Sequence, residues 1–111
     1  MEAILEAIGL TKGEINVYLA LLELGNSSTG RITKKSGVSG SKVYEVLDRL
    51  MQKGLVSSVI KNNVQHFEAS NPHKILNYLD EKQERIDEER KTVKTILPKL
   101  LAKTQGKQPS E

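Results

Sequence analysis

Apolar side chains recur at helical spacing through the first half of the chain, and they predict a series of short helices. The first is an amphipathic segment that ends at Gly9. The second begins after Thr11, which forms a capping-box pattern with Glu14, and it stops at Gly25, a residue suited to a left-handed C-cap. The residues of this helix that are expected to face a core share one stripe: Ile15, Tyr18, Leu19 and Leu22.

The next helix is predicted to be brief, over residues 28–36, with Ser28 as its cap. Ile32 is its only large apolar side chain, so packing against neighbouring helices must hold it in place. A tight turn follows at Gly37 and Val38, and the valine is expected to fill the core between two helices.

A further helix is expected to begin at Ser39 or Gly40 and to end at Gly54. Its apolar residues follow an i, i+3, i+4, i+7 pattern that makes one buried stripe: Val43, Val46, Leu47 and Leu50. The polar residues lie mostly on the opposite face: Ser41, Lys42, Glu45, Asp48, Arg49 and Gln52. Tyr44 borders the two faces, and we expect its ring to be packed rather than exposed.

Two short segments rich in β-branched residues, LVSSVI and VQHFEAS, flank the tripeptide KNN. Both segments are too brief for helices, and asparagine tolerates positive φ, so Asn62 and Asn63 suit a tight hairpin turn. We therefore expect a two-stranded hairpin with Lys61 at its tip.

Asn71 and Pro72 open the last predicted element, with the asparagine as the cap and the proline in the first helical position. One charged helix is expected from there to about residue 104, and Pro98 should kink or divide it. Leucine, isoleucine and valine repeat every seven residues along it, with a second row three positions earlier. The resulting heptad seam comprises Leu76, Leu79, Gln83, Ile86, Arg90, Val93, Leu97 and Leu100.

This seam predicts that two copies of the chain pair along it, in a parallel or an antiparallel arrangement that the pattern leaves open. The alternative is that the helix folds back on the preceding domain, and its first turns through Leu79 are expected to do so in part. Ile86, Val93 and Leu97 lie too far along the helix to reach a small core, whereas Gln83 and Arg90 can set register and strand number.

Helices followed by a hairpin, with a short turn between the last two helices before it, form the winged helix-turn-helix arrangement. We therefore expect an α+β, mostly helical protein. Its expected parts are a winged helix DNA-binding domain over residues 1–70, a long coiled-coil-like dimerisation helix over residues 71–104, and a disordered tail over residues 105–111.

The net charge is only +3, but basic residues are concentrated in the middle of the chain. Residues 26–63 hold seven basic and two acidic side chains, whereas residues 1–25 hold one basic and four acidic side chains. Such asymmetry suggests a surface that faces a polyanion, although an ordinary solvated surface explains so mild a segregation equally well. The sequence has no cysteine and no apolar run near the ~20 residues that span a bilayer, so we expect a cytoplasmic protein without disulfides or a membrane partner.

The run from Leu10 to Val56 resembles the DNA-binding domain of the TrmB family, archaeal transcription regulators that include sugar-responsive repressors. The matching segments are LTKGEINVYLALLELG and ITKKSGVSGSKVYEVLDRLMQKGLV, and the long helix with ILPKL near its end is also similar. The sequence departs from the family at Ser39 and Gly40, where members commonly have a proline and then a basic residue. It also ends where the family's effector-binding domain would begin, so no small-molecule effector is expected from these residues.

In this arrangement the helix after the turn enters the major groove, the helix over residues 28–36 crosses the backbone, and the hairpin reaches backbone or an adjacent groove. Lys42 and Arg49 are the leading candidates for base or phosphate contacts, although Arg49 could instead pair with Glu45 four residues earlier. The alternative for the other cations is that they only keep the surface soluble. The expected DNA-contacting residues are Arg31, Lys34, Lys35, Ser39, Ser41, Lys42, Tyr44, Glu45, Arg49, Lys61, Asn62 and Asn63.

Catalysis has no support in the sequence, which shows neither a nucleophile with a recognisable base nor a glycine-rich phosphate loop. His66 and His73 are the only histidines, and without cysteines or convergent carboxylates no metal or cofactor is expected. The sequence thus favours a homodimeric regulator that binds a pseudo-palindromic operator in double-stranded DNA. The alternative is a protein-interaction module of the transcription machinery, which acidic Glu45 and Asp48 on the exposed face suggest.

Overall fold

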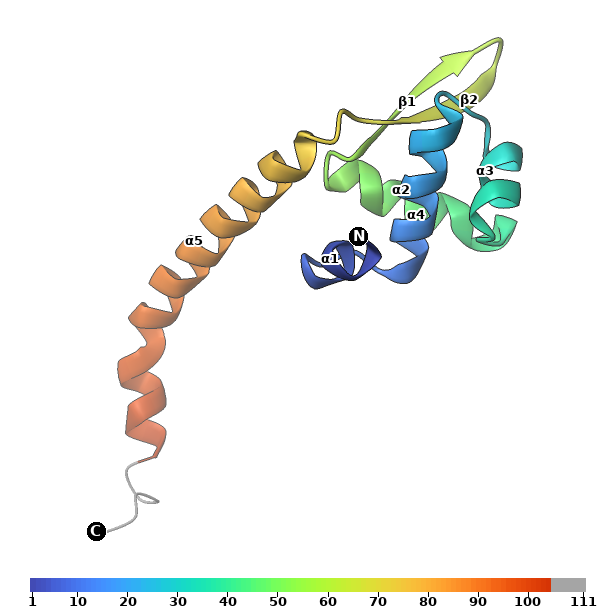
Figure 1. The fold of residues 1–111 in the computed structure, drawn as a ribbon. Helices are drawn as coiled ribbons and strands as arrows, with labels where there is room; N and C mark the ends of the chain where they lie inside the picture. Colours follow the sequence, from blue (N-terminus) through green and yellow to red (C-terminus); the bar gives the residue numbers. More distant parts are fainter. Residues whose placement is uncertain (105–111) are drawn as a thin grey trace. The chain divides into compact units, whose positions relative to one another are not determined.

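The computed structural model describes residues 1–104, and the elements found there follow the predicted order (Figure 1). They are α1 (Glu2–Ala7), α2 (Lys12–Leu24), α3 (Thr29–Ser36), α4 (Gly40–Gln52), β1 (Val56–Lys61), β2 (Val64–Ala69) and α5 (Lys74–Lys103). The expected mostly helical α+β fold with one antiparallel hairpin and a long last helix is confirmed. The tail predicted for residues 105–111 lies outside the described residues.

The chain divides into two units, and the division falls within α5, between Leu79 and Asp80. The first unit contains a single aliphatic core with two buried tyrosines and one phenylalanine. Its buried members are Leu5, Leu10, Ile15, Val17, Tyr18, Leu21, Ile32, Val43, Val46, Leu47, Leu50, Leu55, Val56, Phe67 and Tyr78.

The start of α2 is fixed by the predicted capping box. The amide of Glu14 donates to Thr11 Oγ1 at 3.2 Å, and the amide of Thr11 donates to Glu14 Oε1 at 2.9 Å. Leu10 and Ile15, on either side of the cap, are both buried, as a hydrophobic staple requires. Two backbone amides that a helix start normally leaves unpaired are therefore bonded locally.

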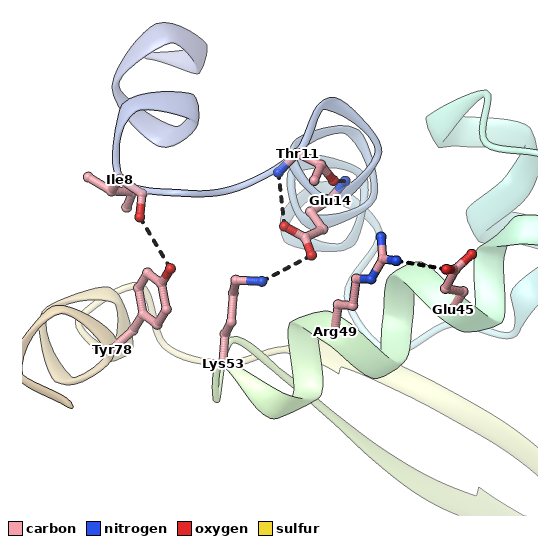
Figure 2. Close-up of polar contacts among 7 residues, drawn as sticks. All are labelled: Ile8, Thr11, Glu14, Glu45, Arg49, Lys53 and Tyr78. Atoms are coloured by element: carbon pink, nitrogen blue, oxygen red, sulfur yellow. Dashed lines mark hydrogen bonds and ion pairs between the residues drawn. The ribbon is translucent and has the colours of Figure 1, made fainter. Parts of the chain in front are cut away.

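The same Glu14 side chain makes a second, long-range contact that the sequence did not predict (Figure 2). Its Oε2 lies 3.0 Å from Nζ of Lys53, the residue that caps the C-terminus of α4. The Glu14 side chain is 1% exposed and the Lys53 side chain 21%, so this ion pair lies largely inside the protein. One carboxylate thus joins the start of α2 to the end of α4.

The predicted core face of α2 was partly wrong. Leu22 is 43% exposed, whereas Val17 and Leu21 are buried in its place. The reason is that α2 contacts α1, α3, α4 and β2, so it is covered on a broader face than one stripe. A single i, i+3, i+4, i+7 row describes a helix with one neighbour better than a helix surrounded by several.

The hairpin has the predicted two-residue turn. Strand pairing runs from Val56 opposite Ala69 to Lys61 opposite Val64, which leaves Asn62 and Asn63 as the turn. Their φ angles are 51° and 62°, as a type I′ turn requires. Lys61 is therefore the last residue of β1, next to the turn.

A third segment also pairs with the hairpin. Ser27 and Phe67 exchange two backbone hydrogen bonds, each 2.8 Å long, in an isolated antiparallel bridge. Asn26 adds a side-chain bond to Glu68 at 3.2 Å. The loop between α2 and α3 therefore holds the base of the hairpin, a contact that two isolated residues gave no sequence pattern to reveal.

The predicted start of the last helix was wrong by two residues. The helix begins at Lys74 rather than Pro72, because Asn71 Oδ1 accepts from the amide of His73 and i to i+3 backbone bonds form one tight turn first. Pro98 does not divide α5, which continues unbroken to Lys103. Proline removes one donor, and the carbonyl that loses this partner belongs to an exposed stretch of helix where water can bond it.

The first turns of α5 belong to the first unit, as expected. Tyr78 is buried, and its hydroxyl donates to the carbonyl oxygen of Ile8 at 3.2 Å (Figure 2). Ile75 and Leu79 are partly buried against the same core. Leu79 therefore packs in part against the core of its own chain, whereas Leu76 is exposed.

In the second unit, the described part of α5 keeps its large apolar side chains in solvent. They are Ile86, Val93, Ile96, Leu97, Leu100 and Leu101, with exposed fractions between 41% and 61%. No helix within residues 1–104 combines the length and the apolar character that a membrane crossing demands.

The buried ion pair generates a first prediction. Lys53→Met should lower the free energy of unfolding by about 3 kcal/mol, because it leaves the Glu14 carboxylate buried without its counter-charge. Glu14→Gln added to Lys53→Met should recover most of that loss, since the amide oxygen can still accept from Thr11. Urea unfolding followed by circular dichroism, at fixed protein concentration, measures both.

The control for this prediction is Lys35→Met, which breaks the exposed pair between Lys35 and Glu23. It should cost less than about 1 kcal/mol, as surface pairs do. Equal losses for the Lys53 and Lys35 variants would contradict the role given to Glu14.

A second prediction concerns Tyr18, whose hydroxyl is buried without a hydrogen-bond partner. Burial raises the pKa of Tyr18 above its usual 10.0. Tyr18→Phe should leave the free energy of unfolding at neutral pH unchanged or raise it by up to about 1 kcal/mol, because no bond is lost. Tyr78→Phe, which loses the bond to Ile8, should instead lower it by about 1 kcal/mol.

The same tyrosine gives an alkaline pH dependence. Above pH 10 the unfolded chain releases the Tyr18 proton while the folded chain keeps it, so stability falls as pH rises. The wild-type protein should therefore lose stability above pH 10 more steeply than Tyr18→Phe. Parallel curves for the two proteins, measured by urea unfolding at a series of pH values, would exclude this effect.

Candidate nucleic-acid interface

The orientation of α4 determines which side chains can meet a partner. Its apolar stripe is buried as predicted: Val43, Val46, Leu47 and Leu50. These residues pack into the core, and α4 contacts α2, α3 and β1. The opposite face is left in solvent, with Ser41, Lys42, Glu45, Asp48, Arg49 and Gln52 all exposed.

The start of α4 carries two exposed hydroxyl groups. Ser39 occupies the N-cap position, but its side chain does not cap the helix; its Oγ lies 3.1 Å from Ser41 Oγ instead. Ser28 likewise stands at the N-cap of α3 without a capping side-chain bond. A Cβ on Gly40 would meet no atom within 4 Å, so the missing basic residue there does not reflect lack of space.

Arg49 and Glu45 form the internal pair that was one of three alternatives for Arg49. Arg49 Nη2 lies 2.7 Å from Glu45 Oε2, across one turn of α4 (Figure 2). Both side chains are about half exposed, so the pair stands at the surface and its remaining hydrogen-bonding atoms can reach a partner. Lys42 is also exposed, near the start of the helix.

Three cations lie together on α3. Arg31, Lys34 and Lys35 are all exposed, and with Leu24 they line one shallow surface hollow. Lys35 Nζ lies 3.1 Å from Glu23 Oε1, an exposed contact that solvent screens. The helix that the sequence placed across a DNA backbone therefore presents its cations on one surface.

The expectation for Tyr44 was wrong, because its side chain is 53% exposed. Its ring meets the Phe67 ring edge-on, with the centroids 6.4 Å apart and the planes at 70°. Phe67 belongs to β2 and is buried in the core, whereas Tyr44 remains about half exposed on α4. Tyr44 thus lies on the exposed side of α4 beside the hairpin.

The far end of the hairpin is exposed on both strands. Lys61, Asn62 and Asn63 are all in solvent, as predicted. Figure 1 shows the turn lying beyond the helices of the first unit. The structure adds three exposed apolar residues that the search for basic and polar candidates passed over: Val59, Ile60 and Val64.

Residues 1–104 contain no group of three or more histidine, aspartate or glutamate side chains placed to hold a metal ion. His66 Nδ1 lies 3.0 Å from the carbonyl oxygen of Val64, and His73 Nδ1 lies 3.1 Å from Asn71 Oδ1.

Helices α2, α3 and α4, with a tight turn before α4 and a two-stranded hairpin after it, define the winged helix-turn-helix class. Solved structures of this class share the fold. The archaeal chromatin protein TrmBL2 superposes with a TM-score of 0.78 at 24% identity, covering 99% of this chain and 42% of that one. A MarR-family regulator from Silicibacter pomeroyi gives a TM-score of 0.57 at 19% identity, covering 88% and 75%.

The chain belongs to the TrmB family. The family model described as "Sugar-specific transcriptional regulator TrmB" matches residues 5–73, which include α2, α3, α4 and the hairpin. The HTH-type sugar sensing transcriptional regulator TrmBL1 of Pyrococcus furiosus is 46% identical over 55 residues, and the uncharacterised protein YrhO of Bacillus subtilis is 43% identical over 51 residues. These alignments cover 50% and 46% of this chain but only 16% and 18% of those relatives.

Proposed function

We propose that this protein is a transcription regulator that binds specific sequences of double-stranded DNA as a homodimer. The observation that carries the proposal is the exposed polar face of α4, whose opposite face is buried in the core. A helix held in this way can enter a major groove without unfolding any part of the domain. Membership of a family of transcription regulators supports the same function.

The proposal assigns different roles to three surfaces of the first unit. The face of α4 reads base edges, with Lys42, Glu45 and Arg49 as the main candidates. The cations of α3 neutralise phosphates and add affinity without sequence preference. The hairpin end, with Lys61, follows the backbone or enters an adjacent groove.

The dimer is proposed to form along α5. Five exposed apolar residues of the heptad seam lie outside the core cluster: Leu76, Ile86, Val93, Leu97 and Leu100. A second copy of α5 would bury them, in a parallel or an antiparallel pair. Two α4 helices spaced about 34 Å apart would then meet successive major grooves of a pseudo-palindromic operator.

A second candidate function is a protein-interaction module of the transcription machinery. Exposed Glu45 and Asp48 on α4, and exposed Ile60 at the hairpin end, favour it, because acidic and apolar side chains suit a protein partner better than a phosphate backbone. Selection of bound sites from random duplex distinguishes the two functions. Enrichment of one sequence family supports the DNA regulator, and no preference over random duplex excludes it.

A third prediction separates affinity from selectivity. Lys34→Ala should weaken binding to all duplexes alike and reduce the salt dependence by about one phosphate contact, because a phosphate carries no sequence information. Lys42→Ala should instead change the ratio between selected and random duplexes. Fluorescence anisotropy at several salt concentrations measures both quantities. Lys12→Ala is the control, because Lys12, at the start of α2, belongs to none of the three proposed DNA-contacting surfaces.

A fourth prediction tests the dimer. Ile86→Asp together with Val93→Asp should place two charges on the seam of each helix and convert the dimer to a monomer. Thr92→Asp together with Thr95→Asp is the matched control, because it adds the same two charges at heptad positions away from the seam. Light scattering gives the solution mass, and a wild-type protein that is already monomeric at micromolar concentration would refute the proposed dimer.

A further inference from the structure

The middle of the exposed face of α4 is acidic rather than basic. With 3.6 residues per turn, Val43, Val46, Leu47 and Leu50 define the buried side, and Ser41, Glu45, Asp48 and Gln52 fall opposite to it. Lys42 and Arg49 lie together on one flank of this face, and Tyr44 lies on the other. A partner that contacts the centre of the exposed face of α4 therefore contacts Glu45.

A carboxylate in this place limits what a duplex can offer it. It accepts hydrogen bonds only, so phosphates and most base-edge atoms in the major groove repel it. The donors available there are the amino groups of cytosine N4 and adenine N6. Glu45 must therefore either meet one of these amino groups or weaken binding.

The ion pair of Glu45 with Arg49 makes the demand more specific. Arg49 Nη2 and Glu45 Oε2 are 2.7 Å apart, and thus present a donor and an acceptor side by side. Cytosine N4 and guanine O6 within one base pair are also side by side, at hydrogen-bond distance, with the donor and the acceptor exchanged. The two pairs of atoms are complementary without separating the ion pair.

The neighbouring atoms of the base pair decide between C·G and T·A. Beyond guanine O6 lies N7, a second acceptor that the guanidinium can reach with another of its five N–H groups. In a T·A pair the atom beyond the thymine acceptor belongs to a methyl group, and the atom beyond the adenine donor is the acceptor N7, which repels a carboxylate. Both differences favour C·G.

We propose, building on the DNA-binding function above, that Glu45 and Arg49 act as one unit that selects a C·G base pair in each half of the operator. Glu45 accepts from cytosine N4, and Arg49 donates to guanine O6 and N7. The pair also lowers affinity for other sequences, because a mismatched base edge leaves the carboxylate against acceptors. Selectivity at this position is thus separated from the phosphate affinity of α3.

The test begins with the operator selected by the wild-type protein and alters single atoms of its C·G pairs. Replacing guanine by 7-deazaguanine removes N7, and replacing cytosine by N4-methylcytosine alters the amino group that Glu45 would meet. Each change at the proposed pair should weaken wild-type binding by at least about fivefold, the lower end of what a bidentate base contact discriminates. Arg49→Ala should no longer respond to the first change, and Glu45→Ala should no longer respond to the second.

Glu45→Gln tests the same position through an expected change of base preference. Glutamine prefers the N6 and N7 atoms of adenine, so the preferred base should change from cytosine to adenine. Glu6→Gln is the control, because it makes the same change at an exposed carboxylate of α1, outside the three proposed DNA-contacting surfaces, and should leave the cytosine preference unchanged. All these side chains are exposed, so unchanged thermal unfolding of the variants is expected and can be checked.

The outcomes separate this inference from the proposed function. Specific binding that persists in Glu45→Ala with an unchanged response to N4-methylcytosine overturns the inference and leaves the regulator function standing. Selected sites that share no C·G pair do the same. Failure of the wild-type protein to prefer any duplex overturns the function itself.

Discussion

The geometry of the first unit depends on the two contacts of the buried Glu14 carboxylate. It accepts from the amide of Thr11 and lies against the ammonium group of Lys53, so it acts at the start of α2 and at the end of α4 together. A buried charge is tolerated only where its bonding capacity is used, and both oxygens of Glu14 are engaged. The angle between α2 and α4 therefore depends on a directional contact as well as on aliphatic packing.

The charged side chains of the first unit are distributed differently on α3 and on α4. The side chains of α3 add three positive charges, whereas the exposed face of α4 carries two cations and two anions: Lys42, Arg49, Glu45 and Asp48. A cationic element attracts any duplex at long range, and a neutral element discriminates at short range because mismatched groups are costly once desolvated. The mild net charge of +3 is consistent with a protein that relies on fit as much as on attraction.

The sequence was sufficient for those parts of the fold that depend on neighbours along the chain. The Thr11 capping box, the buried stripe of α4 and the Asn62–Asn63 turn were predicted because each is a pattern of residues within one or two helical turns or a single loop. The bridge from Ser27 to Phe67 and the ion pair from Glu14 to Lys53 were not, because their partners lie about forty residues apart and neither residue type signals the other. Leu22 and Tyr44 were misplaced for a related reason, since their exposure depends on which neighbours cover α2 and on Phe67 filling the core beside α4.

The bridge at Ser27 has a consequence for how the hairpin can vary. It fixes β2 at Phe67, in the middle of the hairpin, whereas Val59, Ile60 and Val64 nearer the turn are exposed. Because side chains alternate between the two faces of a ribbon, adding or deleting whole residue pairs at the turn would change the reach of the hairpin without changing which face looks inward. The length of the hairpin can therefore vary independently, while the bridged strand pair at Phe67 and the helices of the first unit stay the same.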